Sequence, residues 1–468
     1  MNISPETISR LVAVVGETHA ITDPAQMVSY LKEWRDLWRG TSQLILRPSN
    51  TAEVSAIMKI CNETKTPVIP QSGNSGLVGG QIPMKGEVVL SLDRMTRIIE
   101  VDAANDTITV EAGAILKSVQ EAAEKVDRLF PLSLASEGSA RIGGNLSTNA
   151  GGLNVLAYGT ARELCLGLEV VLPNGEIWNG LKKLRKDNTG YNLKELFLGS
   201  EGTLGIITAA VLKLYPKHRR QDTAIIGLSS VEKAVSALSL AKAQSGNRVV
   251  AFELLPAIGL EFAVKHMGAT NPVATPCPWY VLVELADAGE TALQDILEQA
   301  LEEGLILDAA VASSQTQRSA MWHVRESMSE SQKFEGGSIK HDVSVPVSSV
   351  PQLIEQGCAA VSNFMPGARP VPFGHIGDGN IHFNISQPIG MDKQAYLDQW
   401  AAMNAVIFKI VLQLGGSISA EHGIGVLKRN DMLKIKTPLE LQIMRGLKAQ
   451  FDPNGILSPG RMLPDVQD

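Results

Sequence analysis

The chain has 468 residues, of which 44% are hydrophobic and 19% are charged. This length predicts two or three domains, and the composition predicts a large buried core rather than disorder. The formal net charge of −7 argues against nucleic acid as the main partner. The four cysteines are scattered, with no Cys-x-x-Cys pair, which argues against a zinc knuckle, an iron–sulfur cluster and a disulfide framework.

Isolated thiols fit a reducing compartment, and the first residues show no basic segment followed by an apolar one. No apolar run approaches the roughly 20 residues that a membrane helix needs. The sequence therefore predicts a cytoplasmic protein without direct membrane insertion.

The first half alternates short helices and strands. Residues 1–37 are predicted to be helical. Downstream, helices are expected at 51–64 and 115–124, and strands at 44–48, 67–70, 88–92, 98–101, 107–110, 167–172 and 205–214. A polar break at 216–221 ends this half.

The second half combines longer helices with strands in a pattern typical of an antiparallel sheet layered with helices. Helices are predicted at 231–244 and 288–303, and strands at 223–228, 249–255, 279–285 and 308–313. Residues 426–468 are predicted to be helical and then to turn.

Four windows rich in glycine and small polar residues lie in the first half, at 70–80, 136–145, 147–152 and 199–205. Glycine lets backbone N–H groups turn toward an anion, although each window alone fits an ordinary turn. Neither GxGxxG between a strand and a helix nor GxxxxGK[ST] is present, which disfavours a nicotinamide Rossmann site and a P-loop. The windows predict a large polar ligand bound mainly by backbone.

Two histidine windows lie in the second half, at 374–384 and 419–423. Two histidines and a glutamate are a common ligand set for a catalytic divalent metal. A hairpin through residues 377–379 would return His382 beside His375, with Asn380 on the same strand face as His382. The alternative is a pair of polar histidines at a sheet edge.

Residues 417–420 are strand-like and lead to Glu421 and His422. Neighbours in an extended segment point in opposite directions, so regular geometry does not place both on one metal. A bent backbone would aim Glu421 at the metal and His422 at a substrate.

The windows at 70–80, 143–152 and 186–205 resemble the FAD-binding domain of the vanillyl-alcohol-oxidase (PCMH-type) flavoproteins. The histidine windows resemble the C-terminal domain of the D-2-hydroxy-acid dehydrogenase branch, and agreement runs from about residue 38 to the end. The implied fold is α+β. Its parts are a helical segment at 1–37, a PCMH-type FAD-binding domain of two α+β subdomains at 38–217, an α+β substrate and metal-binding cap domain with an antiparallel sheet at 218–425, and a helical segment at 426–468 that packs on the FAD domain.

The resemblance implies that FAD is held by residues of the glycine-rich windows. They are Pro70, Gln71, Ser72, Gly73, Asn74, Ser75, Gly76, Leu77, Gly138, Ser139, Ile142, Gly143, Gly144, Asn145, Thr148, Asn149, Gly151, Gly152, Glu201, Gly202, Gly205 and Ile207. Some relatives attach the flavin through a histidine in the first loop. Because Asn74 stands there and the loop has no histidine, non-covalent FAD is expected.

The resemblance also divides the roles of the polar side chains. The implied metal ligands are His375, His382 and Glu421, with Zn²⁺ preferred and Mn²⁺ or Fe²⁺ tolerated. The implied catalytic base is His422. The implied substrate contacts are Arg325, Ser329, Lys340, Asn384 and His422. From the residues alone, a surface salt bridge is the simpler reading of Arg325 and Lys340.

The expected function is oxidation of a D-2-hydroxy acid by an FAD- and metal-dependent dehydrogenase. His422 would take the hydroxyl proton with the help of the metal, and hydride would pass to flavin N5. Two cations, Arg325 and Lys340, favour a second carboxylate, as in D-2-hydroxyglutarate or D-malate, over D-lactate. Without a cluster motif, the electrons need a carrier such as an electron-transfer flavoprotein; a homodimer is compatible with the sequence.

Three alternatives remain from the sequence. The nearest is the FAD subunit of a D-lactate dehydrogenase or glycolate oxidase complex. A metallohydrolase would be colourless. A non-catalytic flavin-containing assembly subunit would be yellow but not reduced by a hydroxy acid.

Overall fold

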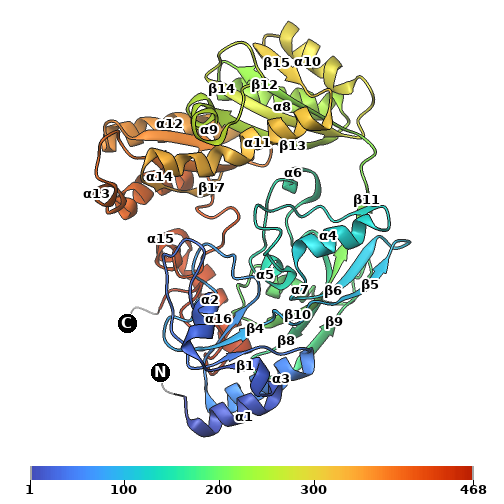
Figure 1. The fold of residues 1–468 in the computed structure, drawn as a ribbon, viewed down its shortest axis with the longest axis vertical. Helices are drawn as coiled ribbons and strands as arrows, with labels where there is room; N and C mark the ends of the chain where they lie inside the picture. Colours follow the sequence, from blue (N-terminus) through green and yellow to red (C-terminus); the bar gives the residue numbers. More distant parts are fainter. Residues whose placement is uncertain (1–2, 466–468) are drawn as a thin grey trace. The chain divides into compact units, whose positions relative to one another are not determined.

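The computed structural model describes residues 3–465 and divides into two compact units (Figure 1). The first unit holds residues up to 152, residues 158–217 and the chain from 421 on. The second unit holds residues 153–157 and 218–420. Each unit mixes helices with sheets, so the predicted α+β class is confirmed. The predicted domain limits stay predictions.

The first unit contains a four-stranded sheet of order β1-β2-β4-β3, in which β2 and β3 run parallel to β4. Its strands are β1 (Ala20–Ile21), β2 (Ile45–Leu46), β3 (Val68–Gln71) and β4 (Val88–Ser91). Helix α3 (Thr51–Thr64) begins after the N-cap Asn50, whose side chain accepts the N–H of Glu53. It buries an apolar face in the core of this unit.

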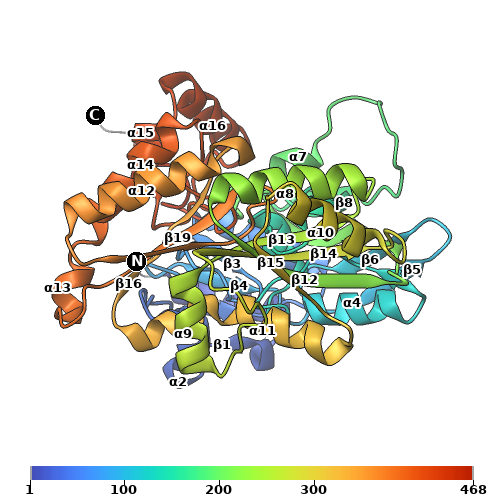
Figure 2. The same cartoon turned by 90° about the horizontal axis from the view of Figure 1, so that it is seen from above.

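The second sheet of the first unit has five antiparallel strands in the order β5-β6-β10-β8-β9. They are β5 (Ile98–Asp102), β6 (Thr107–Glu111), β8 (Cys165–Val171), β9 (Ile177–Gly180) and β10 (Ile206–Lys213). The helices beside them are α4 (Leu116–Glu124) and the short α5 (Ile142–Ser147), which contacts β6 and β10. After β9 the chain runs as a long loop to α7 (Lys194–Phe197) (Figure 2).

Residues 1–37 are predicted to be helical, and the described part of this segment, from residue 3 on, is helical only in part. Helix α1 (Pro5–Val15) ends at Gly16, whose φ of +79° is a conformation that favours glycine. The chain then pairs as β1 with β2 before α2 (Pro24–Leu31) begins. Strand pairing overrides local helix propensity here.

The second unit is built around an antiparallel sheet of order β13-β14-β12-β15. Its strands are β12 (Gln221–Leu228), β13 (Val249–Pro256), β14 (Trp279–Ala286) and β15 (Asp308–Val311). Helices α8 (Val231–Gln244) and α10 (Ala292–Glu302) cover one face (Figure 2). Helices α9 (Ala257–Met267) and α11 (Gln315–Ser331) cover the other face. On that face, Ile225 and Leu282 of the sheet share an apolar core with residues of these two helices.

A smaller sheet in the second unit is centred on β19 (Asn380–Ser386). Strand β18 (Arg369–Phe373) pairs along one edge, and β16 (Ser338–Ile339) and β17 (Asp342–Ser344) share the other. Helices α12 (Val350–Phe364) and α14 (Trp400–Gln413) pack together, and α12 contacts β18. The backbones of Leu254 and Gly374 exchange two hydrogen bonds, which join the edge of β13 to this smaller sheet.

The C-terminal segment belongs to the first unit. It contains α15 (Met432–Ile435) and α16 (Pro438–Phe451), which starts with a capping box of Thr437 and Glu440. Beyond α16 the buried guanidinium of Arg461 pairs with buried Glu87 at 2.7 Å, which ties this segment to the residue before β4.

Further short elements occur elsewhere in the chain. They include β7 (Arg128–Leu129), β11 (Tyr215–Pro216), α6 (Val155–Tyr158) and α13 (Lys393–Leu397).

Among the described residues, no helix combines the length and the apolar character that crossing a bilayer requires.

Candidate active site

A cleft in the first unit encloses about 870 Å³ of empty space, part of it open to solvent. The end of β3 with the loop that follows it, helix α5, and the turn before β10 with the first residues of β10 form most of its wall. Fifteen residues predicted to hold a cofactor line it: Pro70, Gln71, Ser72, Gly73, Asn74, Ser75, Gly76, Gly143, Gly144, Asn145, Thr148, Glu201, Gly202, Gly205 and Ile207.

The wall of the cleft is shaped by close backbone approaches. A Cβ atom on Gly73 would lie 2.4 Å from the carbonyl oxygen of Ser139, so only glycine fits where these two windows meet. Bare backbone of this kind can approach a phosphate-bearing ligand closely.

Two buried polar atoms in the cleft fit a polar ligand. Nδ2 of Asn145 and Oδ1 of Asn74 have no hydrogen-bond partner among the described residues. Nδ2 of Asn74 donates to the carbonyl oxygens of Ser29 and Lys32, which fixes the orientation of this side chain. Because buried polar groups are rarely left unpaired, a large polar cofactor fits this cleft well.

Seven predicted cofactor residues lie outside the wall: Leu77, Gly138, Ser139, Ile142, Asn149, Gly151 and Gly152. Ile142 is buried in the core of the first unit. The side chain of Asn149 accepts from Thr160 and from the backbone of Arg162.

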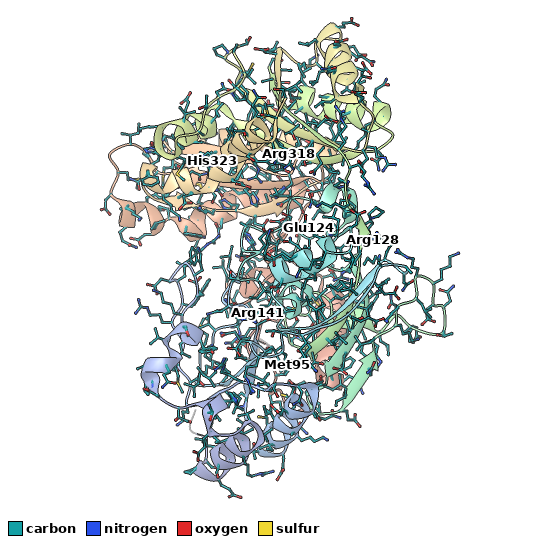
Figure 3. The ribbon with its side chains drawn as sticks, turned by 45° about the vertical axis from the view of Figure 1, so that its right-hand side comes forward. Met95, Glu124, Arg128, Arg141, Arg318 and His323 are labelled. Carbon is teal, nitrogen blue, oxygen red and sulfur yellow. The ribbon has the colours of Figure 1, made fainter. Side chains whose placement is uncertain are left out.

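Arg141 lines the cleft but was missed by the sequence analysis (Figure 3). One guanidinium nitrogen donates to the carbonyl oxygens of Asp93 and Gly113. Burial lowers the pKa of Arg141. In the sequence, the single arginine within the glycine-rich window at 136–145 could have indicated a role in ligand binding.

His422, the predicted base, lines the same cleft. The loop that carries it is clamped by Glu201, whose two carboxylate oxygens accept the backbone N–H groups of Ile424 and Gly425, each at 2.7 Å. Burial raises the pKa of Glu201. The Glu201 carboxylate therefore lines the cleft and also holds the backbone of the loop that carries His422.

Glu421, the predicted carboxylate ligand, belongs to the first unit and directly follows the last residue of the second. One of its oxygens accepts the backbone N–H of Gly152 at 2.5 Å. A carboxylate has several acceptor positions, so this hydrogen bond is compatible with metal binding.

The two predicted histidine ligands lie together in the second unit. His375 follows β18 and His382 lies in β19, and their ring centroids are 5.4 Å apart. Gly374 has a φ of +135°, and a Cβ there would lie 3.1 Å from Cδ2 of His382. Glycine therefore lets the chain turn between the strands and bring the imidazoles close.

Glu253 is a buried residue of this cluster that the sequence analysis missed. Its Oε1 lies 2.9 Å from Nδ1 of His375, and its Oε2 accepts from Nε of Arg325 at 2.7 Å. Burial alone would raise the pKa of Glu253, but the adjacent His375 and Arg325 together lower it to about 2. A carboxylate that holds Nδ1 leaves Nε2 for a metal, an arrangement common around metal-binding histidines.

Four of the five predicted substrate residues also lie in the second unit, and the fifth, His422, belongs to the first. Arg325 lies on α11, buried, with its guanidinium 5.1 Å from the ring centroid of Phe373. Nζ of Lys340 donates to Oγ of Ser329 at 2.8 Å. Asn384 is buried two residues beyond His382 in β19.

One local strand prediction near these residues is wrong. Residues 417–420 form only an isolated bridge, between Ser344 and Ser417. Residues 338–344 form two short strands, β16 and β17, interrupted at Lys340 and His341. His341 is anchored instead, with Nδ1 2.7 Å from the carbonyl oxygen of Phe383.

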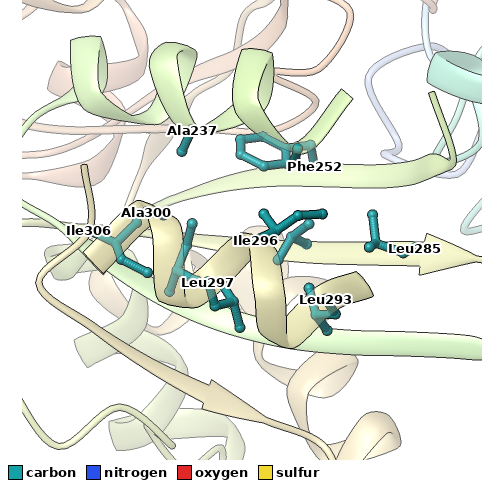
Figure 4. Close-up of a pocket in the computed structure, with 11 residues that line it drawn as sticks. Ala237, Phe252, Leu285, Leu293, Ile296, Leu297, Ala300 and Ile306 are labelled. Carbon is teal, nitrogen blue, oxygen red and sulfur yellow. The ribbon is translucent and has the colours of Figure 1, made fainter. Parts of the chain in front are cut away.

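A second pocket lies in the core of the second unit, between α8, α10 and the sheet (Figure 4). All its lining side chains are apolar, including Phe252, Leu285 and Ile296. It offers nothing to orient a carboxylate and belongs to the core.

Two family models match the chain. The model described as an FAD binding domain matches residues 42–180. The model described as FAD linked oxidases, C-terminal domain, matches residues 217–462. Together they define an FAD-dependent oxidoreductase.

Three relatives match across both units. A mitochondrial D-2-hydroxyglutarate dehydrogenase of Danio rerio is 40% identical, covering 95% of this chain and 83% of the relative. A D-2-hydroxyglutarate dehydrogenase of Stutzerimonas stutzeri is 34% identical, with coverages of 98% and 99%. A putative mitochondrial D-lactate dehydrogenase of Schizosaccharomyces pombe is 36% identical, with coverages of 94% and 85%.

The chain belongs to the D-2-hydroxyglutarate dehydrogenase family of FAD-dependent hydroxy-acid dehydrogenases. Some relatives are named as mitochondrial and the bacterial one is not, so the cytoplasmic location stays a prediction.

Solved structures agree on the fold. p-Cresol methylhydroxylase matches with a TM-score of 0.77 at 17% identity, covering 98% of each chain. An alkyldihydroxyacetonephosphate synthase matches with a TM-score of 0.75 at 19% identity, covering 98% of this chain and 85% of the other. The predicted PCMH-type fold is confirmed.

Proposed function

We propose that this FAD-dependent enzyme oxidises D-2-hydroxyglutarate to 2-oxoglutarate with the help of a divalent metal. The observation that carries the proposal is the charged cluster of His375, Glu253 and Arg325, which offers a metal ligand and a carboxylate-binding cation in one buried network. The names of the Danio rerio and Stutzerimonas stutzeri relatives support this substrate.

The metal in this proposal is held by His375, His382 and Glu421. His375 is buried, and the other two are half-buried. Two imidazoles and a carboxylate are a ligand set that Zn²⁺ prefers and that Mn²⁺ or Fe²⁺ also accept. A divalent cation held there supplies positive charge that lowers the pKa of a neighbouring hydroxyl group.

The proton in this proposal moves to His422. Its imidazole lines the cleft of the first unit and is carried by the loop that Glu201 clamps. A neutral imidazole has a free nitrogen lone pair that can take the hydroxyl proton. FAD, when bound in the cleft, supplies the acceptor for the hydride that leaves the substrate carbon. Loss of a proton and a hydride converts the alcohol to a ketone.

Substrate selection in this proposal depends on two cations. Arg325 presents a planar fork to one carboxylate, while Lys340 and Ser329 donate to the other, with Asn384 as a further polar contact. D-Malate also has two carboxylates and remains a candidate substrate. No cluster motif occurs in the sequence, so an external carrier such as an electron-transfer flavoprotein fits as acceptor.

The test compares D-2-hydroxyglutarate, D-malate and D-lactate with the wild type and Lys340→Met. Loss of a charged hydrogen bond costs about 1.5–3 kcal/mol, so the variant should lose about 10–100-fold in kcat/KM for the dicarboxylates. Its kcat/KM for D-lactate should change little. Lys333→Met removes an exposed lysine nearby and serves as the matched control.

The S. pombe relative makes D-lactate oxidation the second candidate. A wild type that prefers D-lactate or glycolate, with equal losses for all substrates in Lys340→Met, would contradict the dicarboxylate assignment and favour this candidate.

A further inference from the structure

Glu253 lies in the middle of β13, a strand whose residues are all buried. Its side chain is 1% exposed, which is costly for a charged group unless the charge is compensated. The compensation is divided between two partners. Oε1 meets Nδ1 of His375 at 2.9 Å, and Oε2 meets Nε of Arg325 at 2.7 Å.

Three elements bring these groups together. Strand β13 supplies Glu253 on the face that α11 covers, so Arg325 reaches it from the helix. The edge of β13 pairs with the turn after β18, where N–H of Leu254 donates to the carbonyl of Gly374 at 2.8 Å and the reverse bond is 3.0 Å. This pairing places His375 beside Glu253.

The hydrogen-bonding roles follow from the chemistry of the groups. A carboxylate only accepts, so the hydrogen of the His375 imidazole lies on Nδ1, and Nε2 is the nitrogen able to bind a metal. Oε2 of Glu253 also accepts a hydrogen bond from Nε of Arg325. The terminal nitrogens of that guanidinium are then oriented as a fork for a substrate carboxylate.

We propose that Glu253 is a positioning residue that fixes the His375 tautomer for the metal and the Arg325 fork for the substrate, and so couples the two subsites through one buried carboxylate. This inference rests on the proposed metal-dependent function.

The chain offers a matched control at Glu284 in β14. Glu284 is also buried in an apolar strand and also accepts from an arginine of α11, with Nε of Arg318 at 2.8 Å. Its other partners include Trp322 and Thr223, and among the described residues no histidine of the predicted metal set forms a hydrogen bond with it. It shares the burial and the ion pair of Glu253 without the histidine.

The experiment uses the full-length FAD-loaded protein after removal of metal by chelation. Zn²⁺ affinity is measured by competition with a chromophoric chelator, and KM for D-2-hydroxyglutarate is measured after Zn²⁺ is restored. In Glu253→Gln the amide can accept from Arg325 only by donating to Nδ1, which moves the imidazole hydrogen to Nε2. Zn²⁺ affinity should fall about 10–100-fold, and KM should rise.

Glu284→Gln should keep the wild-type Zn²⁺ affinity, although it lowers the thermal midpoint by breaking its ion pair. If Glu253→Gln does not yield folded protein, Glu253→Asp keeps the charge but is one methylene too short to reach both partners. It should show a smaller loss of Zn²⁺ affinity together with a raised KM.

The outcomes separate this inference from the proposed function. Wild-type protein that binds Zn²⁺ and needs it for turnover, with unchanged affinity in the Glu253 variants, would overturn the role of Glu253 and leave the function standing. Wild-type protein that turns over fully without metal would overturn both. An equal loss of Zn²⁺ affinity in Glu284→Gln would overturn the positioning role of Glu253, because any buried glutamate of the sheet would then have the same effect.

Discussion

The cleft of the first unit and the histidine cluster of the second are built in different ways. The cleft wall consists mainly of glycines, small polar residues and turned backbone, with Arg141 and Glu201 as its charged side chains besides His422. The cluster is built from side chains, where Glu253 holds both His375 and Arg325. Apart from His422, substitutions in the cleft are therefore expected to act through shape, whereas substitutions in the cluster are expected to act through charge and hydrogen-bond direction.

The largest effect is expected at His422, a side chain of the cleft and the proton acceptor of the proposed mechanism. His422→Gln should lower the rate of FAD reduction by substrate about 10²–10⁴-fold, because a general base is lost. FAD content should stay normal, since the glycine-built wall is untouched. Stopped-flow absorbance measures the rate, and His323→Gln, at an exposed histidine on α11, is the control (Figure 3).

A reduction rate within threefold of wild type in His422→Gln would remove this histidine from the proposed mechanism and would leave shape as the main contribution of the cleft.

The next largest effect tests whether FAD binding depends on the shape of the cleft wall. Gly73→Val places a side chain where even a Cβ would meet the Ser139 carbonyl at 2.4 Å. The purified variant should carry little FAD, measured by the absorbance ratio of flavin to protein. Gly446→Ala is the control, because a Cβ there meets nothing within 4 Å. Normal FAD content in Gly73→Val would contradict the close-packed wall.

The smallest effect concerns a charged cluster of the second unit with no role in the proposed chemistry. Hydrogen bonds from His266, Lys265 and Arg369 lower the pKa of Glu335 to about 2. Because the pKa of Glu335 is lower in the folded protein than in the unfolded chain, these contacts stabilise the fold. The stabilisation is fully present above about pH 4.5 and is lost as the pH falls toward 2. Glu335→Gln should destabilise the protein by about 2 kcal/mol at neutral pH.

Urea unfolding of the wild type and Glu335→Gln at pH 7 and pH 3 measures this contribution. The difference in free energy of unfolding should shrink at the lower pH. An equal difference at both values would show that lost packing, and not charge, dominates at this position.

The sequence predicts best those elements whose ends are marked locally. Helix α3 has the predicted bounds because Asn50 caps its start, and α8 has them because Ser230 does the same. The strand within residues 1–37 was missed because its partner, β2, lies more than twenty residues away along the chain. Pairing of this kind is not encoded in local periodicity.

The candidate site shows the same limit. His375 and His382 were found because a glycine turn separates two histidines over a short distance in the sequence. Glu253 lies more than a hundred residues from His375 and was missed. A charged residue inside an apolar strand was the available signal, but Glu284 shows the same signal in β14 without a contact to the histidines. Only the three-dimensional arrangement separates the two glutamates.

The most direct test of the account is an anaerobic visible spectrum of the purified protein before and after addition of D-2-hydroxyglutarate, with D-lactate and glycolate in parallel and a chelated sample beside each. We predict flavin bands that D-2-hydroxyglutarate bleaches and that prior chelation protects from bleaching. Bleaching that survives complete removal of metal, or bleaching by D-lactate or glycolate alone, would contradict it.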